Sequence, residues 1–311
     1  MVLLVDRPSD GVVLLTLDLP DRRNAMTDEL TTAWVEAVTA LRGDRTVRCV
    51  VVTGAGKAFC SGGDLGWLAA GGASVDALRD KMLPFYRAWL GLRALDVPSI
   101  AALNGAAVGA GAALALSCDI RYAGEAASLS VPFAQLGMHA GMATTYTLTE
   151  VAGVAAAREL LLTGRVVRAQ ELLRLGLCSE VFEADALLPS VLERAAQVAS
   201  GAPVATRLHK EALRDGGPSS LERALAWESL AQPVTMATED LQEGLRAKAD
   251  KRPARFTGRC PRRPEARARA GPGRAGAPGP RRRSPSPCER FRSTGGSVVQ
   301  QPRSRFRGAS T

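Results

Sequence analysis

The feature that most constrains this chain is a repeated pattern of an apolar strand followed by a glycine turn and a helix. Residues 49–53 (Cys-Val-Val-Val-Thr) form a continuous apolar run, which is typical of a strand buried on both faces. Gly54 and Gly56 end that run. The pattern recurs at 99–117, where a strand, an Asn-Gly turn and small residues follow one another. This alternation predicts an α/β core with helices packed on sheets.

A membrane-spanning helix is an alternative for the same region. The 22 residues between Asp96 and Asp119 carry no charge and contain a GxxxG pattern. A run of this length and character can cross a membrane as a helix. Pro98, the Asn-Gly turn at 104–105 and the dominance of Ala and Gly over larger apolar residues favour a buried strand, turn and helix instead. We therefore expect no membrane association.

Shorter segments complete the predicted order of elements. Thr27 is the expected N-cap of a helix that runs to about Leu41. Further short strands are expected at 2–5, 11–17, 119–123 and 177–181, and helices at 188–199, 204–214 and 219–248. We expect three parts: a core over 1–200, a helical oligomerisation region over 201–259, and a tail over 260–311.

The net charge of +9 belongs to that tail. Residues 260–311 contain thirteen Arg and two Glu, a net charge of +11, which leaves residues 1–259 with 27 basic and 29 acidic side chains, a net charge of −2. The tail is rich in Pro and Gly and lacks apolar periodicity, so we expect it to be disordered. Its arginines suit an acidic surface or nucleic acid electrostatically, but its composition also resembles GC-rich sequence translated out of frame. Nucleic acid is not expected as a partner of the core.

Six cysteines without a CxxC pair and two histidines make a zinc site or a disulfide framework unexpected. No metal is therefore predicted. The N-terminus lacks the basic and long apolar regions of a signal peptide, so a cytoplasmic location is expected.

Two glycine-rich loops carry the predicted chemistry. Residues 54–65 and 98–114 each follow a buried strand and lead toward a helix, which brings bare backbone N–H groups to a surface where a ligand oxygen can bind. A tight turn that merely needs glycine is the alternative. A dinucleotide fingerprint fails because a third glycine is missing after Gly109 and Gly111, and no Walker Gly-Lys-Ser/Thr occurs.

Linked motifs over residues 1–259 resemble the crotonase superfamily, the enoyl-CoA hydratase/isomerase family. They are Asn24-Ala-Met, the segment 58–65 (Ala-Phe-Cys-Ser-Gly-Gly-Asp-Leu), the segment 98–105 with Gly109-Ala-Gly111, the segment 117–121 (Ser-Cys-Asp-Ile-Arg), and Leu162-Thr-Gly164 with Ala169 and Gly176-Leu177. The resemblance implies a crotonase-like β-β-α superhelix of the ClpP/crotonase type. It also implies a helical C-terminal trimerisation region, with homotrimers that often pair into hexamers.

The resemblance further implies an acyl-CoA thioester as substrate, with coenzyme A as part of the substrate and no separate cofactor. By position, the N–H groups of Gly63 and Ala110 form an oxyanion hole for the thioester oxygen. An enolate oxygen held by two fixed donors is strongly stabilised. The expected substrate-binding residues are Ala58, Gly63, Asp64, Leu65, Ala110, Phe133 and Arg23, the last with Arg22 near the CoA phosphates.

The family pattern breaks where hydratases carry two glutamates as general acid and base. Those positions hold Ala113 and Phe133, and Gly141 stands where dienoyl-CoA isomerases have a further acid. The two glycine-rich loops therefore predict thioester binding and stabilisation of an enolate. They do not predict addition of water, because the two glutamates that would hold and activate the water are missing.

His139 is the expected replacement for proton transfer, since histidine titrates near neutral pH; packing of its ring against its own loop is the alternative. Tyr86, Tyr146 and Glu150 are further polar groups that could reach the pocket. Cys60 is expected to be a buried small residue rather than a nucleophile, and His209 a surface residue near the CoA site.

The sequence is compatible with two functions. The first is an enzyme of the enoyl-CoA hydratase/isomerase type, a lyase or isomerase of fatty acid metabolism that acts through an enolate. The second is a non-catalytic acyl-CoA-binding homologue or assembly partner, which the loss of both glutamates suggests.

Overall fold

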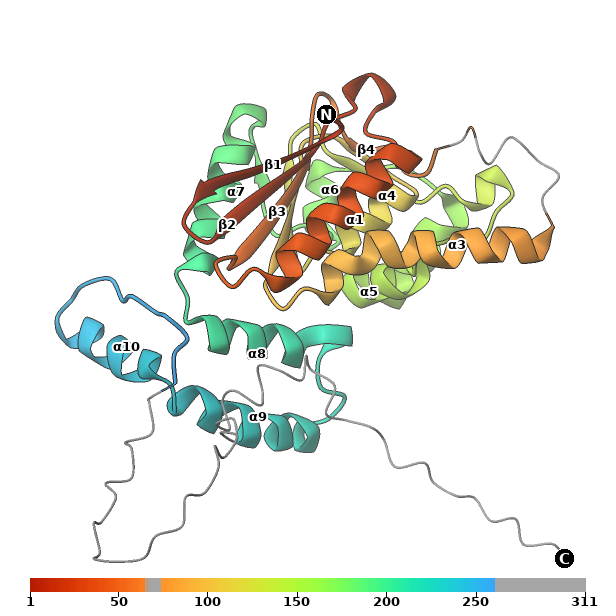
Figure 1. Cartoon of the computed structure of the whole chain (residues 1–311). Coiled ribbons are helices and arrows are strands. Elements are labelled where there is room, and N and C mark those ends of the chain that lie inside the picture. The colour runs from red at the N-terminus through yellow and green to blue at the C-terminus, as the bar shows by residue number, and fades with distance from the viewer. Residues whose placement is uncertain (65, 67–73, 261–311) are drawn as a thin grey trace, which may run out of the picture.

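The computed structural model describes residues 1–64, 66 and 74–260, which form an α/β fold with two sheets (Figure 1). The strands are β1 (Leu3–Ser9), β2 (Val12–Leu17), β3 (Cys49–Gly54), β4 (Ala58–Cys60), β5 (Ser99–Leu103), β6 (Ala106–Val108), β7 (Ile120–Gly124), β8 (Ser128–Ser130), β9 (Val167–Arg168) and β10 (Val181–Phe182). The helices are α1 (Asp28–Gly43), α3 (Val75–Trp89), α4 (Ala110–Ser117), α5 (Thr144–Thr163), α6 (Ala169–Arg174), α7 (Ala184–Ala199), α8 (Pro203–Leu213), α9 (Leu221–Met236) and α10 (Glu239–Ala249). Four short 3-10 helices are η1 (Pro20–Arg22), η2 (Leu90–Ala94), η3 (Ala134–Leu136) and η4 (Arg214–Gly216).

A two-strand unit repeats along the chain and builds both sheets. The first strand of each pair, β3, β5 or β7, adds in parallel to the large sheet, whose order is β1-β2-β3-β5-β7-β10. The second strand, β4, β6 or β8, adds in parallel to the small sheet, whose order is β4-β6-β8-β9. The β5-β6 pair continues directly into α4. This is the β-β-α superhelix that the resemblance implied.

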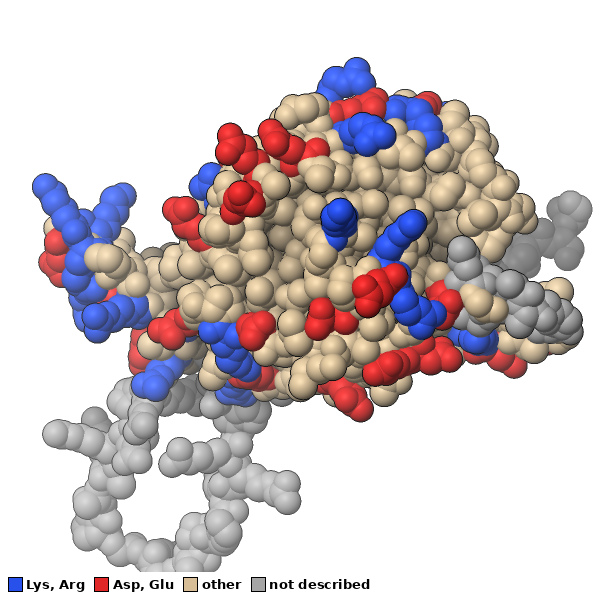
Figure 2. Space-filling view, turned by 90° about the horizontal axis from the view of Figure 1, so that it is seen from above, with Lys and Arg blue, Asp and Glu red and all other residues tan. Residues whose placement is uncertain are grey.

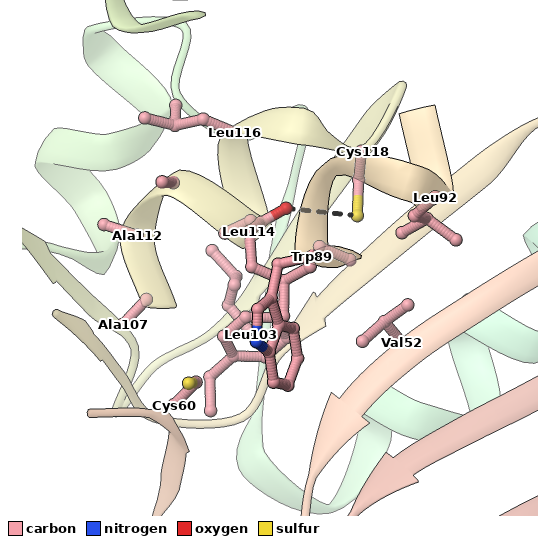
Figure 3. Packing of buried hydrophobic residues seen from close by; sticks show 14 of the residues in the cluster. Val52, Cys60, Trp89, Leu92, Leu103, Ala107, Ala112, Leu114, Leu116 and Cys118 are labelled. Carbon is pink, nitrogen blue, oxygen red and sulfur yellow. Dashed lines mark hydrogen bonds between the residues drawn. The ribbon is translucent and has the colours of Figure 1, made fainter. Parts of the chain in front are cut away.

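The large sheet is covered on both faces, as the unbroken apolar runs predicted. Val50 and Val52 of β3 face a large core cluster, whereas Cys49 and Val51 face a smaller cluster under α7. Successive residues of a strand point to opposite faces, so each run supplies both clusters. The larger cluster surrounds Trp89, part of it shown in Figure 3.

The uncharged stretch after Asp96 folds as β5, β6 and α4, so the prediction of a strand, a turn and a helix is confirmed. Helix α4 has 8 residues, and those from Gly111 to Ser117 are buried. Among the described helices, none is long and apolar enough to span a bilayer. The lack of charge in this stretch therefore reflects burial in the protein core.

The helical C-terminal part lies beside the core (Figure 1). Helix α8 is tied to the large sheet by the buried Lys210, whose ammonium group donates to the carbonyl of Val97 and contacts Asp119, each at 2.8 Å. The tail beyond residue 260 lies outside the described residues. Figure 2 shows acidic and basic side chains interspersed on the visible face, in keeping with the near-zero charge of residues 1–259.

Local predictions hold at some boundaries and fail at others. Thr27 caps α1 by accepting the Leu30 N–H at 3.1 Å, as predicted. The single helix expected over 219–248 is wrong, because the chain turns between α9 and α10. The Asp240 carboxylate in the first turn of α10 accepts the N–H groups of Thr257 and Gly258, and this distant contact fixes the new helix start. The strand expected over 177–181 is restricted to β10.

Candidate active site

Two asparagines hold the loop that follows β3. Asn24 is fully buried, and its side-chain amide donates to the carbonyl of Ala58 at 2.8 Å. Asn104, directly after β5, donates to the carbonyl of Gly56 at 3.0 Å and accepts the N–H of Gly54 at 3.2 Å. Each side chain replaces a missing backbone partner, so the loop is fixed although it belongs to no regular ladder.

The two predicted glycine-rich loops touch backbone to backbone. A Cβ atom at Gly111 would overlap the carbonyl group of Cys60. A Cβ atom at Gly62 would lie 2.6 Å from the carbonyl oxygen of Val108 and 3.1 Å from the backbone nitrogen of Ala110. Only glycine permits such an approach, and at Gly62 the φ of +95° requires it as well. The glycines therefore bring the two loops into contact.

Gly63 and Ala110, which flank this contact, both line one cavity of about 130 Å³. Ala110 is the first residue of α4, and the first N–H groups of a helix have no acceptor within the helix. No described residue accepts a hydrogen bond from the N–H of Ala110 or of Gly63. The structure thus brings Gly63 and Ala110 to the same cavity, and the role of their N–H groups as donors to a thioester oxygen stays a prediction.

The cavity is mainly apolar. Its walls come from α3, the loop at 61–63, the start of α4 and the segment 132–142. Phe133 lines it and is 9% exposed, whereas Ala113 is fully buried in α4 and is not a lining residue. No described lining residue is an Asp or a Glu. A water molecule held for addition to a double bond would find few polar partners here.

His139 and Tyr86 are the polar candidates that the structure places at this cavity. His139 is exposed, and its Nδ1 atom lies 2.7 Å from the carbonyl oxygen of Ala140. Tyr86 is half-buried, and burial raises the pKa of its phenol above the usual value. The phenol is therefore protonated at neutral pH and acts as a donor.

The other polar candidates lie elsewhere. Tyr146 stacks under the Arg93 guanidinium at 5.9 Å, and Glu150 forms an ion pair with Arg93 at 2.8 Å. His209 is exposed on α8, and with Glu150 it lines a separate cleft between α8 and the core. His209 is thus a surface residue, as expected, and its position near the CoA site stays a prediction.

Helix α3 supplies one wall of the cavity that the sequence analysis did not assign. Met82, Phe85 and Tyr86 line the cavity, and Trp89 one turn further is fully buried in the core. These four residues follow the i, i+3, i+4, i+7 spacing of one helix face. That spacing is the sequence signal that could have revealed the helix.

Cys60 and Ala58 support the loop rather than the cavity. Cys60 is fully buried, its thiol donates to the carbonyl of Asn24 at 3.1 Å, and burial raises its pKa to about 12. A thiol that stays protonated at neutral pH is a poor nucleophile. Ala58 is buried in β4 and does not line the cavity, so its expected contact with substrate stays a prediction.

The charged residues near the loop lie outside the cavity. Asp64 accepts the N–H of Gly66 at 2.9 Å and pairs with Arg22 at 2.7 Å, and these bonds, the first above all, lower its pKa. Arg23 is exposed and adopts a left-handed φ of 51°. Leu65 and the helix expected near Asp64 fall on 65 and 67–73, outside the described residues.

Comparison with known proteins decides the family. The family model for enoyl-CoA hydratase/isomerase matches residues 7–259. The chain belongs to the enoyl-CoA hydratase/isomerase family. The crotonase resemblance stated from its motifs is confirmed, and with it membership of a family of enzymes.

Individual members are similar along most of their length. A 2,3-dehydroadipyl-CoA hydratase of Escherichia coli is 36% identical over 259 residues, 83% of this chain and 99% of that protein. A probable enoyl-CoA hydratase of Mycobacterium tuberculosis is 41% identical over 212 residues, 68% of this chain and 81% of that protein. The crystal structure of an enoyl-CoA hydratase from Bacillus anthracis superposes with a TM-score of 0.78 at 34% identity, and covers 82% of this chain and 99% of that one.

The loop contact leads to a test of stability. Gly111→Ala pushes a methyl group into the Cys60 carbonyl, and we expect it to lower the free energy of unfolding by about 1–3 kcal/mol. Gly43→Ala is the matched control, because a Cβ there has no atom within 4 Å; its stability should stay within about 1 kcal/mol of the parent. Urea unfolding followed by circular dichroism measures both. Equal stability of the two variants would contradict the close contact.

Proposed function

We propose that this family member is an enzyme that converts an acyl-CoA thioester through an enolate. The thioester oxygen accepts hydrogen bonds from the N–H groups of Gly63 and Ala110. The observation that supports the proposal is that Gly63 and Ala110 line one apolar cavity and that no described residue accepts a hydrogen bond from their N–H groups. When a proton leaves the carbon next to the thioester, negative charge develops on the oxygen, and two fixed dipoles stabilise it without reorganising.

The favoured reaction is movement of a double bond along the acyl chain rather than addition of water. Phe133 and Ala113 stand at the two positions where hydratases of the family have glutamates, and the cavity has no carboxylate among its described lining residues. Isomerisation needs only that a proton be removed from one carbon and returned to another. His139 is the proposed base, because its imidazole lines the same cavity as both N–H groups.

Coenzyme A is proposed as the handle of the substrate, with no separate cofactor. Its phosphates require a basic side chain at the mouth of the site, and Arg23 is exposed beside the loop that carries Gly63. Arg22 is less available, since it pairs with Asp64.

We propose a cytoplasmic location, which the free, buried thiols of Cys49, Cys60 and Cys118 favour.

A homotrimer, or a hexamer of two trimers, is proposed as the assembly. Large apolar side chains are exposed on the C-terminal helices, among them Leu221 (73%), Leu230 (64%) and Leu245 (57%). Exposed apolar side chains concentrated in one region are typical of an interface with another chain.

The oxyanion proposal is tested by removing one N–H group. Ala110→Pro deletes the donor at the first position of α4, where proline is tolerated, and we expect kcat for 3-enoyl-CoA isomerisation to fall by about 10²–10³-fold. Ala110→Gly keeps the N–H and should retain activity within a few-fold. Normal activity of a folded Ala110→Pro enzyme would remove this residue from the mechanism.

The role of His139 is tested separately. His139→Ala should lower kcat by about 10²-fold or more, as loss of a general base does, and leave the affinity for a saturated acyl-CoA unchanged. His209→Ala is the control, since that histidine lines a different cleft. Unchanged kcat in His139→Ala would show that its ring only packs against its loop.

The non-catalytic alternative has a distinct outcome. The apolar residues at the two glutamate positions are the observation that favours it. Tight binding of acyl-CoA in calorimetry, with no turnover of crotonyl-CoA or 3-enoyl-CoA by the parent protein, would replace the enzyme by an acyl-CoA-binding homologue.

The assembly is checked by mass. Light scattering should give three or six times the chain mass of 32.7 kDa. Leu230→Arg places a charge on the exposed face of α9 and should shift the protein toward monomer, whereas Val5→Arg, on an exposed position of the edge strand β1, should not. A monomer at micromolar concentration in the parent protein would contradict the proposal.

A further inference from the structure

The phenol of Tyr86 lies directly against Gly141. A Cβ atom built on Gly141 would be 2.5 Å from the hydroxyl oxygen of Tyr86 and 2.9 Å from its Cζ atom. Gly141 is not among the residues with positive φ, so its backbone does not require glycine. The glycine instead leaves the room that the tyrosine hydroxyl occupies. Tyr86 therefore reaches the part of the cavity at which a side chain on residue 141 would point.

The Tyr86 hydroxyl has no hydrogen-bond partner in the described part of the chain. The other lining side chains with a polar hydrogen differ in this respect: the Ser61 hydroxyl donates to the Arg22 carbonyl, and the His139 ring contacts the Ala140 carbonyl. A hydroxyl without a partner in the protein is available to donate a hydrogen bond to a bound ligand. Of the two side-chain hydroxyls on the described cavity wall, Ser61 and Tyr86, that of Tyr86 is thus the one that no described residue engages.

The walls around Tyr86 determine what its hydroxyl can do. Phe85 packs against the Tyr86 ring with centroids 6.2 Å apart, and the cavity has no acid among its described lining residues. No Asp, Glu, Lys or Arg is among the described lining residues, and burial raises the pKa of the Tyr86 phenol, so the phenol stays neutral. A neutral phenol is suited to giving a proton and is a weak base.

We propose that Tyr86 is a catalytic residue that donates its hydroxyl proton to carbon when the thioester enolate collapses. The enolate electron pair forms a new C–H bond with the phenol proton, the phenol O–H bond breaks, and the negative charge passes from the enolate oxygen to the phenolate. Solvent water at the cavity mouth returns a proton to the phenolate, while the proton first taken by His139 is released to solvent, so the isomerisation is balanced. This inference rests on the proposed enolate chemistry at Gly63 and Ala110.

The test uses Tyr86→Phe in the full chain, with Tyr146→Phe as the matched control. Tyr146 is a tyrosine outside the cavity, so its variant should keep kcat unchanged. Tyr86→Phe should lower kcat for 3-enoyl-CoA by about 10²-fold or more, and incorporation of solvent deuterium into the product should fall in parallel. The Kd for butyryl-CoA, measured by calorimetry, should stay within three-fold.

A second pair of variants keeps the test decisive. Gly141→Ala forces the Tyr86 hydroxyl to move and should lower kcat although the tyrosine is still present. In the Tyr86→Phe background the added methyl group still meets the ring at Cζ, but no hydroxyl is left for it to displace. The double variant should therefore be no slower than Tyr86→Phe alone, because both substitutions remove the same hydroxyl contact. Thermal melting confirms that each variant is folded.

The outcomes separate this inference from the proposed function. If Ala110→Pro abolishes turnover and Tyr86→Phe keeps kcat within three-fold, the enolate chemistry stands and Tyr86 is not the donor. If Tyr86→Phe weakens butyryl-CoA binding as much as it lowers kcat, its role is structural and the inference falls. Absence of turnover and of deuterium exchange in the parent protein overturns both.

Discussion

The direct backbone contact between the loop after β4 and the first turn of α4 is the constraint on which the candidate site depends. Gly111 sits against the Cys60 carbonyl and Gly62 against the Val108 carbonyl, at distances that leave no room for a side chain. Asn24 and Asn104 fix the same loop by bonding its carbonyl groups. These contacts lie within the chain itself, so in the proposed mechanism the N–H groups of Gly63 and Ala110 would need no rearrangement to receive an oxyanion.

The chemistry of the cavity follows from what surrounds those N–H groups. Phe133 and the α3 side chains Met82 and Phe85 keep the walls apolar, and dipoles act more strongly in such surroundings than in water. The proposed enolate chemistry also requires that a proton leave one carbon and that a proton be returned to another. His139 and Tyr86, the residues proposed for these two steps, line the cavity from different segments, the loop after η3 and helix α3.

The fold was predictable where a local pattern and its tertiary role agree. The uncharged stretch 97–118 was predicted as strand, turn and helix because its small residues and Asn-Gly turn suit that order, and β5, β6 and α4 confirm it. Helix α3 was not assigned, since only Trp89 of it is buried and Pro84 interrupts its pattern. The break between α9 and α10 depends on Asp240 bonding to residues 257 and 258, which local periodicity does not report.

For the site, the sequence alone determined the family, because glycines, asparagines and acids at fixed spacings are properties of the chain itself. The same motifs led to the prediction of Gly63 and Ala110 as N–H donors and of Ala113 and Phe133 in place of the two glutamates. Only the tertiary structure decided which distant polar groups reach the cavity. Tyr86 does so because α3 packs across the site and Gly141 leaves room for its hydroxyl, whereas Tyr146 and Glu150 turn to Arg93. Proximity between segments more than fifty residues apart is set by packing, which no local pattern encodes.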